Sequence, residues 1–209
     1  PVLNEDGKLE VFRTNWWFFK TNLIQSALPG ISSQLQSLEN SLRTPDGAMT
    51  FVLRIRHEKA RILCINNLKN IGLAARIYAV DNSGRYPFQV PEREGGCLEH
   101  SGIDQDGEAI EPWYFFRVLS NELNVPKLVV CPSDPHASVA LNWGVFGSKN
   151  CSYKVRLGDQ VGEDQPTEVL GWCPFHTNVL TCDGAVRSLA GQEAVKAFAG
   201  RTRQSWRVQ

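Results

Sequence analysis

The stretch that decides the fold is residues 57–87, which read HEKARILCINNLKNIGLAARIYAVDNSGRYP. Its apolar residues recur at steps of three and four, and the resulting stripe consists of Ala60, Cys64, Leu68, Ile71, Ala75 and Tyr78. This spacing predicts an α-helix over residues 57–80 with one buried face. Turn-forming residues follow at 81–84, and Pro87 prevents the helix from resuming. A sheet is the most economical partner for such a face.

Downstream of this helix, short segments have the patterns of strands, turns and further helices. Strands are predicted at 125–130, 150–155, 167–172 and 179–182, and helices at 113–123 and 192–199. Asp183-Gly184 predicts a tight turn into residues 185–189, with Gly184 at positive φ. One long helix with several short strands favours an α+β fold.

Three segments of the chain carry a resemblance to a known family. They are CINNLKNIGLAARIYAVDNSGRYP at 64–87, VCPSD at 130–134 and HTNVLTCDGAV at 176–186. In this order they resemble bacterial type II secretion pseudopilin-like proteins, which are type IV pilin-like, above all the branch common in planctomycetes and verrucomicrobia. The last segment is similar to the family's closing strand, where a His is followed after a short gap by Asp-Gly. The resemblance implies a pilin-like fold, with a long N-terminal helix packed on a small antiparallel sheet.

The resemblance also implies a function and a location. We expect a non-enzymatic structural subunit or accessory protein of an envelope-associated type II secretion or pilus-like assembly. The family brings no catalytic residues, and we expect no cofactor and no metal. The expected partners are other pilin-like subunits or envelope proteins, and the expected location is the periplasm or the cell surface.

The N-terminal residues depart from the family, which has a very apolar membrane-and-filament helix there. We expect an extension of a short strand and helices at residues 1–45, followed by a pilin-like globular domain at 46–209. Asp46 or Thr44 can cap a helix that starts near Ala48. Because the chain opens on Pro1, we expect a trimmed or processed piece whose export signal and membrane anchor lie upstream. No run of about 18 apolar residues predicts a membrane span in the chain as given.

Surface chemistry suggests contact sites and excludes one class of partner. The 22 basic and 22 acidic residues cancel, and the absence of a basic stripe excludes nucleic acid. An aromatic cluster is typical of packed residues but also suits a contact surface, and it consists of Trp16, Trp17, Phe18 and Phe19. A rival hypothesis is an exported binding module that reuses a pilin-like head and binds through this cluster or through residues 91–112. At 104–108 the sequence DQDGE favours a plain acidic turn over a calcium loop, because the required Glu at the twelfth position is missing.

Six cysteines are many for an ordinary cytosolic domain, and their even number predicts disulfides and an oxidising compartment. Free buried thiols and a metal site are the alternatives. A metal site would draw on Cys173-Pro-Phe-His176 and on Cys131 with His136, but the sequence lacks the paired Cys-x-x-Cys motifs of zinc sites. A further rival is a zinc-dependent enzyme that uses Cys173 and His176. A structural role is favoured because no oxyanion motif or orienting carboxylate completes a catalytic set.

The disulfide pairing is predicted from position in the chain. If Thr177-Asn178 is the turn of a two-residue hairpin, Cys173 lies opposite Cys182, within reach of a disulfide. Cys64 on the buried helix face and Cys131 after a strand expected to lie over that face form the second predicted pair. The remaining cysteines give the third pair by elimination, Cys97–Cys151.

Overall fold

The computed structural model describes residues 44–104, 107–158 and 161–189, together with the single positions 37 and 40. The chain divides into two compact units, residues 1–56 and 57–209, and each is described by itself. Several predictions lie outside the described residues, namely the N-terminal strand and helices, the cluster Trp16–Phe19 and the closing helix at 192–199. The predicted domain boundary after residue 45 stays a prediction.

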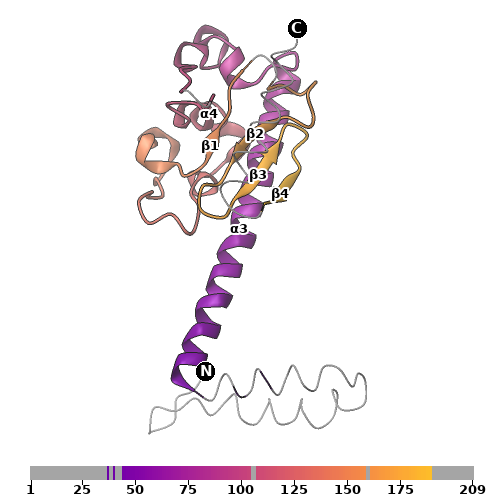
Figure 1. Ribbon diagram of the computed structural model, residues 1–209. Coiled ribbons are helices and arrows are strands. Elements are labelled where there is room, and N and C mark those ends of the chain that lie inside the picture. Colours follow the sequence, from indigo (N-terminus) through magenta and orange to yellow (C-terminus); the bar gives the residue numbers. More distant parts are fainter. Residues whose placement is uncertain (1–36, 38–39, 41–43, 105–106, 159–160, 190–209) are drawn as a thin grey trace. The chain divides into compact units, whose positions relative to one another are not determined.

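The long helix is α3, Pro45–Asp81 (Figure 1). It contains the whole segment predicted as helical and also the start expected near Ala48, and the two are continuous. The predicted face is buried, since Cys64, Leu68 and Ile71 are at most 2% exposed. Beyond Asp81 the backbone turns at Gly84, which has φ +81° and donates its N–H to the carbonyl of Ala79. Ser83, at φ +59°, and Gly84 are both left-handed, so the helix ends within the turn-forming residues that the sequence identifies.

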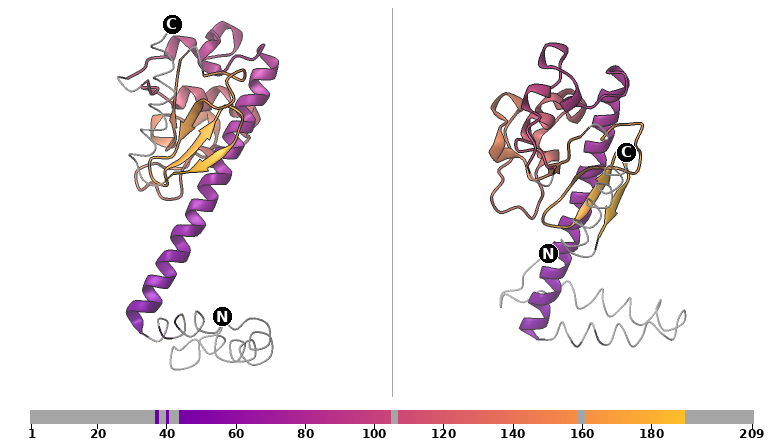
Figure 2. Two further views of the ribbon diagram at one scale, coloured as in Figure 1. Left: turned by 45° about the vertical axis from the view of Figure 1, so that its right-hand side comes forward. Right: turned by 45° about the horizontal axis from the view of Figure 1, so that its top comes forward.

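A four-stranded antiparallel sheet lies against the C-terminal half of α3, and two further views show the same arrangement (Figure 2). Its strands, in spatial and chain order, are β1 Lys154–Val155, β2 Val169–Trp172, β3 Asn178–Thr181 and β4 Val186–Ser188. Helix and small antiparallel sheet together make the α+β class that the sequence predicts. Leu170 and Leu180 join α3 in the main core, whereas Val169, Trp172 and Val179 form a smaller cluster.

The hairpin between β3 and β4 has the predicted turn. Leu180 pairs with Val186, and Gly184 has φ +82°. The Asp183 carboxylate accepts hydrogen bonds from the Thr181 hydroxyl and from the Ala185 N–H, which lower its pKa below the usual value. The turn residues thus bind their own backbone, as Asp-Gly turns require.

The remaining connections are mostly short helical turns. The helix predicted at 113–123 is present as α4 Trp113–Val118 and α5 Ser120–Leu123, with Leu119 at the junction and Phe116 and Leu123 buried. The strand predicted at 125–130 is wrong, because Pro126 begins a 3-10 helix, η4 Pro126–Val129. The other 3-10 helices are η1 Pro87–Gln89, η2 Glu92–Glu94, η3 Leu98–His100, η5 Trp143–Val145 and η6 Ser148–Asn150.

The ends of the acidic segment at 104–108 are joined by backbone and side-chain hydrogen bonds. Asp104 donates its backbone N–H to the Glu108 carbonyl, and its carboxylate accepts the Glu108 N–H at 2.9 Å. No helix among the described residues is long and apolar enough to cross a membrane.

Candidate functional site

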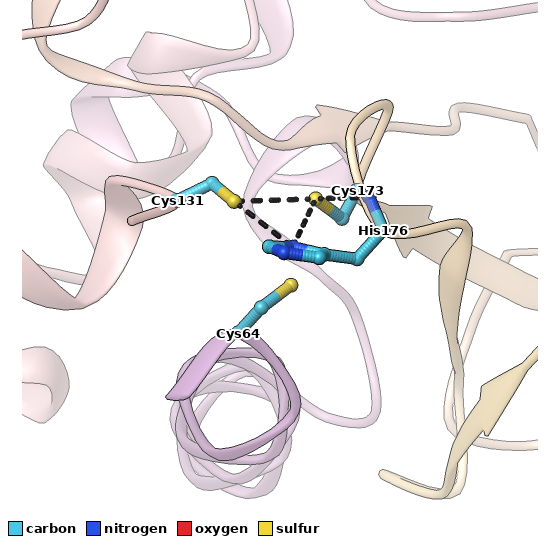
Figure 3. A group of neighbouring side chains, drawn as sticks. All are labelled: Cys64, Cys131, Cys173 and His176. Atoms are coloured by element: carbon cyan, nitrogen blue, oxygen red, sulfur yellow. Dashed lines mark hydrogen bonds between the residues drawn. The ribbon is translucent and has the colours of Figure 1, made fainter. Parts of the chain in front are cut away.

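A buried cluster of three cysteines and one histidine lies between α3 and the loops of the sheet (Figure 3). Its members are Cys64, Cys131, Cys173 and His176, and their potential ligand atoms all lie within 4.8 Å of one another. The three cysteines are at most 1% exposed and His176 is 7% exposed. No other such group of metal-ligating side chains occurs in the parts of the chain that the structure describes.

The four members come from three parts of the fold. Cys64 belongs to the buried face of α3, and Cys131 begins the turn after η4. Cys173 directly follows β2, and His176 lies in the turn that leads into β3. The cluster therefore joins the long helix, the η4 turn and the β2–β3 turn at one point.

The separations between the four groups are short. Cys131 Sγ lies 3.3 Å from His176 Nδ1 and 3.6 Å from Cys173 Sγ, and Cys173 Sγ lies 3.8 Å from His176 Nδ1. Figure 3 shows the Cys64 sulfur pointing from α3 toward the other three side chains. All four polar ends thus converge on one small volume.

Every sulfur of the cluster accepts an N–H group from the protein. The backbone N–H of Ser133 donates to Cys131 Sγ at 3.5 Å, and that of His176 donates to Cys173 Sγ at 3.4 Å. The side-chain amide of Asn178 donates to Cys64 Sγ at 3.3 Å. Asn178 is fully buried, and the Ser188 hydroxyl fixes its orientation by donating to its Oδ1 at 2.6 Å. The surroundings therefore present three donors to three sulfur atoms.

His176 is held by a second contact at its other ring nitrogen. Ser133 Oγ lies 3.0 Å from Nε2, while Nδ1 faces the sulfurs of Cys131 and Cys173. The ring of His57 on α3 lies 5.7 Å from that of His176, tilted by 60°. With Nε2–H donating to the Ser133 hydroxyl, Nδ1 keeps its lone pair on the side of the cysteines.

The thiols influence one another's ionisation strongly. Hydrogen bonds from Cys131 and then Cys173 lower the pKa of Cys64 far below its usual value. Side-chain hydrogen bonds with Cys131 and then Cys64, together with burial, raise the pKa of Cys173. Ionisation of one of these thiols therefore disfavours ionisation of its neighbours.

The predicted disulfides are absent, and all six cysteines are free thiols. The pair Cys173–Cys182 fails because the hairpin register differs from the predicted one. Trp172 pairs with Val179, and the Cys173 N–H bonds to the Asn178 carbonyl, so Cys182 lies beyond reach along the sheet. The sulfur atoms of Cys64 and Cys131 lie within 4.8 Å of each other, but both belong to a cluster of four that also holds Cys173 and His176.

The other three cysteines lie outside the cluster. Cys97 and Cys182 are at most 1% exposed, and burial raises the pKa of each to about 12. Cys151 is half-buried, and burial raises its pKa to about 11. The predicted pair Cys97–Cys151 is not formed, since both are free. Their raised pKa values make all three weak nucleophiles at neutral pH.

The metal alternative in the sequence identified three of the four cluster members. His136 was the wrong fourth, because it is exposed and its backbone N–H bonds to Asp134 Oδ1. Cys64 is the fourth member, and the sequence pattern treats it as one more apolar residue on the buried helix face.

Comparisons of this chain with protein-family models, with curated proteins and with solved structures find no match.

Proposed function

We propose that this chain is a non-enzymatic structural subunit or accessory protein of an envelope-associated type II secretion or pilus-like assembly, with a pilin-like globular head. It works in the periplasm or at the cell surface, with other pilin-like subunits or envelope proteins as partners. The support comes from how the three segments that resemble pseudopilins meet in space.

The single observation that carries the proposal is that these three segments contact one another directly. Asn67 on α3 donates its side-chain N–H to the Val130 carbonyl at 3.1 Å and to the Tyr153 hydroxyl at 3.2 Å. The buried hydroxyl of Tyr86 donates to the Cys182 carbonyl at 3.0 Å. The three segments, 64–87, 130–134 and 176–186, thus pack against one another. The resemblance therefore rests on one contiguous part of the fold and not on isolated short motifs.

The exposed side chains of α3 are consistent with assembly through this helix. Large apolar residues that are at least 43% exposed recur along its first half, namely Met49, Val52, Leu53, Ile55, Ile62 and Leu63. Arg54 and Arg56 are exposed among them, so this part of α3 offers both apolar and basic groups for contact with another protein.

A structural role is preferred over the zinc-dependent enzyme that the sequence also suggested. Cys173 and His176 are buried with two further cysteines, and four protein groups leave no open position for a substrate or a reactive water. Cys173 Sγ also accepts the His176 backbone N–H, which holds it in place rather than presenting it to a cleft.

The proposal is tested by site-specific photocrosslinking in cells that make the natural full-length protein. A photoreactive phenylalanine analogue at Leu53, an exposed apolar position, should give adducts with another copy or with a pilin-like protein in the envelope fraction. The same analogue at Asn70, an exposed polar position of α3, is the control. A protein found only in the cytosolic fraction, without adducts at Leu53, would contradict the proposal.

A second candidate function is an exported binding module, and one cavity favours it. A cavity of about 430 Å³ is lined in part by Leu98, Ser101 and Ile103 from the loop at 91–112. Arg156, which is 6% exposed, and Phe115 also line it. A pocket of this size with apolar walls and one guanidinium suits a small organic anion.

Thermal unfolding with a panel of small carboxylates and phosphates tests this second candidate. A ligand should raise the unfolding temperature of the wild type, and Arg156→Gln should abolish that rise. Arg117→Gln, a change at an exposed arginine of α4, is the control that should keep it. No shift with any anion of the panel would remove the binding module from consideration.

A further inference from the structure

We propose that Cys64, Cys131, Cys173 and His176 bind one Zn²⁺ ion in a closed four-coordinate site, and that Ser133 positions His176 for it. The proposal concerns the head of the protein alone and holds whether or not the chain belongs to a secretion assembly. Its evidence is geometric, and it consists of the separations, the N–H donors and the contact at Nε2.

The separations among three of the four ligand atoms are close to the edges of a coordination tetrahedron. Zn–S bonds are about 2.3 Å and Zn–N bonds about 2.0–2.1 Å, so neighbouring ligand atoms lie roughly 3.5–3.8 Å apart. The three measured separations among Cys131, Cys173 and His176 are 3.3, 3.6 and 3.8 Å. Cys64 faces this triangle from α3 within the 4.8 Å that encloses all four ligand atoms. Three ligands thus form one face of the tetrahedron, and Cys64 supplies the fourth corner.

The hydrogen bonds around the sulfurs indicate thiolates rather than a disulfide. A thiolate accepts hydrogen bonds strongly, and metal-bound thiolates are usually tuned by such outer contacts. Each of the three sulfurs accepts one N–H group, from Ser133, His176 and the fixed Asn178 amide. A disulfide would join only two of the three cysteines, and it would not account for the third cysteine and the histidine beside it. One divalent cation uses all four groups.

The ligand set selects zinc among the common metals. Three soft thiolates with one imidazole in tetrahedral arrangement are typical of structural zinc, whereas calcium and magnesium require oxygen ligands. Burial of all four groups also suits a closed site, since none of them faces solvent. The ion would join α3 to the turn after η4 and to the β2–β3 turn, three segments that come from distant parts of the sequence.

Ser133 is assigned as a positioning residue. Metal-binding histidines nearly always donate their other ring N–H to a protein acceptor, which fixes the tautomer and the ring orientation. Ser133 Oγ provides this acceptor at 3.0 Å from Nε2, so Nδ1 is the ligand atom. The same residue donates its backbone N–H to Cys131 Sγ, so one short turn orients two of the four ligands.

Metal analysis of the full chain, purified without chelators, tests the site. We expect one zinc per chain in the wild type and in Cys151→Ser, a change at a half-buried cysteine outside the cluster. Cys64→Ser should lose the zinc. Replacement of zinc by Co²⁺ should give the visible absorption of a tetrahedral ion and a thiolate-to-metal band, neither of which depends on a functional assay.

The role of Ser133 is tested separately, in a variant that keeps all four ligands. Ser133→Ala should bind zinc about 10–100-fold more weakly in competition with a chromophoric chelator, the usual cost of losing such an outer contact. Ser133→Thr, which keeps the hydroxyl, should restore the affinity. Equal affinities in all three proteins would show that the hydroxyl does not orient His176.

Three results would overturn the zinc site. They are a metal-free wild type that gives no cobalt spectrum on titration, copper or iron in place of zinc, and a disulfide between Cys131 and Cys173 in a non-reducing peptide map. If Cys64→Ser fails to fold, the cobalt spectrum of the wild type and the Ser133 affinities still decide the question.

Discussion

Gly72 of α3 lies directly against Gly184 in the turn between β3 and β4. A Cβ atom on Gly72 would lie 3.1 Å from Gly184 Cα and 2.8 Å from Leu180 Cδ1. Nearby, Arg76 Nη1 donates to the Asp183 carbonyl at 3.3 Å. The helix and the hairpin are therefore in direct backbone contact at this point.

Gly72→Ala should destabilise the protein, although alanine is the better helix former. The gain in helix propensity is about 1 kcal/mol, whereas overpacking costs about 1–3 kcal/mol. Leu180 can move its methyl group, but the Gly184 backbone is held by a tight turn, so we expect a net loss of about 1 kcal/mol. Urea unfolding measures it. Gly147→Ala, where an added Cβ meets nothing within 4 Å, is the control, and equal stability of the two variants would contradict the close approach.

Leu68→Ala should cost about 2–5 kcal/mol of unfolding free energy, the range for a core leucine. Leu68 is 1% exposed and belongs to the main core between α3, the sheet and α4. Leu73→Ala on the same helix is the matched control, since Leu73 is 57% exposed and its loss should change stability by less than about 0.5 kcal/mol. Similar losses from both substitutions would mean that the buried face of α3 is assigned wrongly.

The helix and the hairpin could be predicted because their signals are local. The 3.6-residue period of 57–80 and the Asp183-Gly184 turn each follow from neighbouring residues alone. The 3-10 helices have only three or four residues, too few to show a period, and η4 was mistaken for a strand because its sequence, PKLV, is mostly apolar. The predicted helix at 113–123 is divided at Leu119, whose backbone has φ −78° and ψ +15°, and the apolar pattern does not predict this break.

The cluster could be predicted only in part, because its members meet through the tertiary fold. Cys64 counts as one more apolar residue in a helix stripe, since a cysteine packs like a small hydrophobe. The even number of cysteines then favoured disulfides. A usable signal was the repeated Cys-Pro, at Cys131-Pro132 and Cys173-Pro174. In both places a backbone N–H two or three residues later returns to the sulfur.

Gly184→Val should destabilise the protein by about 1–3 kcal/mol, the usual cost of a strained backbone. Gly184 has φ +82°, and a β-branched residue clashes in this conformation. Gly184→Asn is the control, because asparagine tolerates left-handed backbone, and it should lose less. The comparison is made by thermal unfolding. An equal loss in both variants would show that contact with α3, and not the backbone angle, sets the requirement for glycine.

Alkaline pH should weaken the fold through the buried thiols outside the cluster. Burial raises the pKa of Cys97 to about 12, from an ordinary value of 9.0 in the unfolded chain. A group whose pKa is raised by folding contributes full stability below the unfolded pKa and loses it as the pH rises toward the folded pKa. The window is therefore about pH 9 to about pH 12, with a limiting slope of about 1.4 kcal/mol per pH unit for each such thiol.

Urea unfolding of Cys97→Ala between about pH 9 and about pH 10 isolates this effect. The variant is expected to be less stable than the wild type at every pH, because the substitution leaves a cavity. Its stability should nevertheless fall less steeply with pH, since one buried thiol no longer has to stay protonated. Comparing slopes cancels the cavity, which shifts the whole curve by a constant. Cys182, whose pKa is also raised to about 12, remains in both proteins and keeps the residual slope above zero. Parallel curves for the two proteins would mean that Cys97 ionises as easily in the folded chain as in the unfolded one.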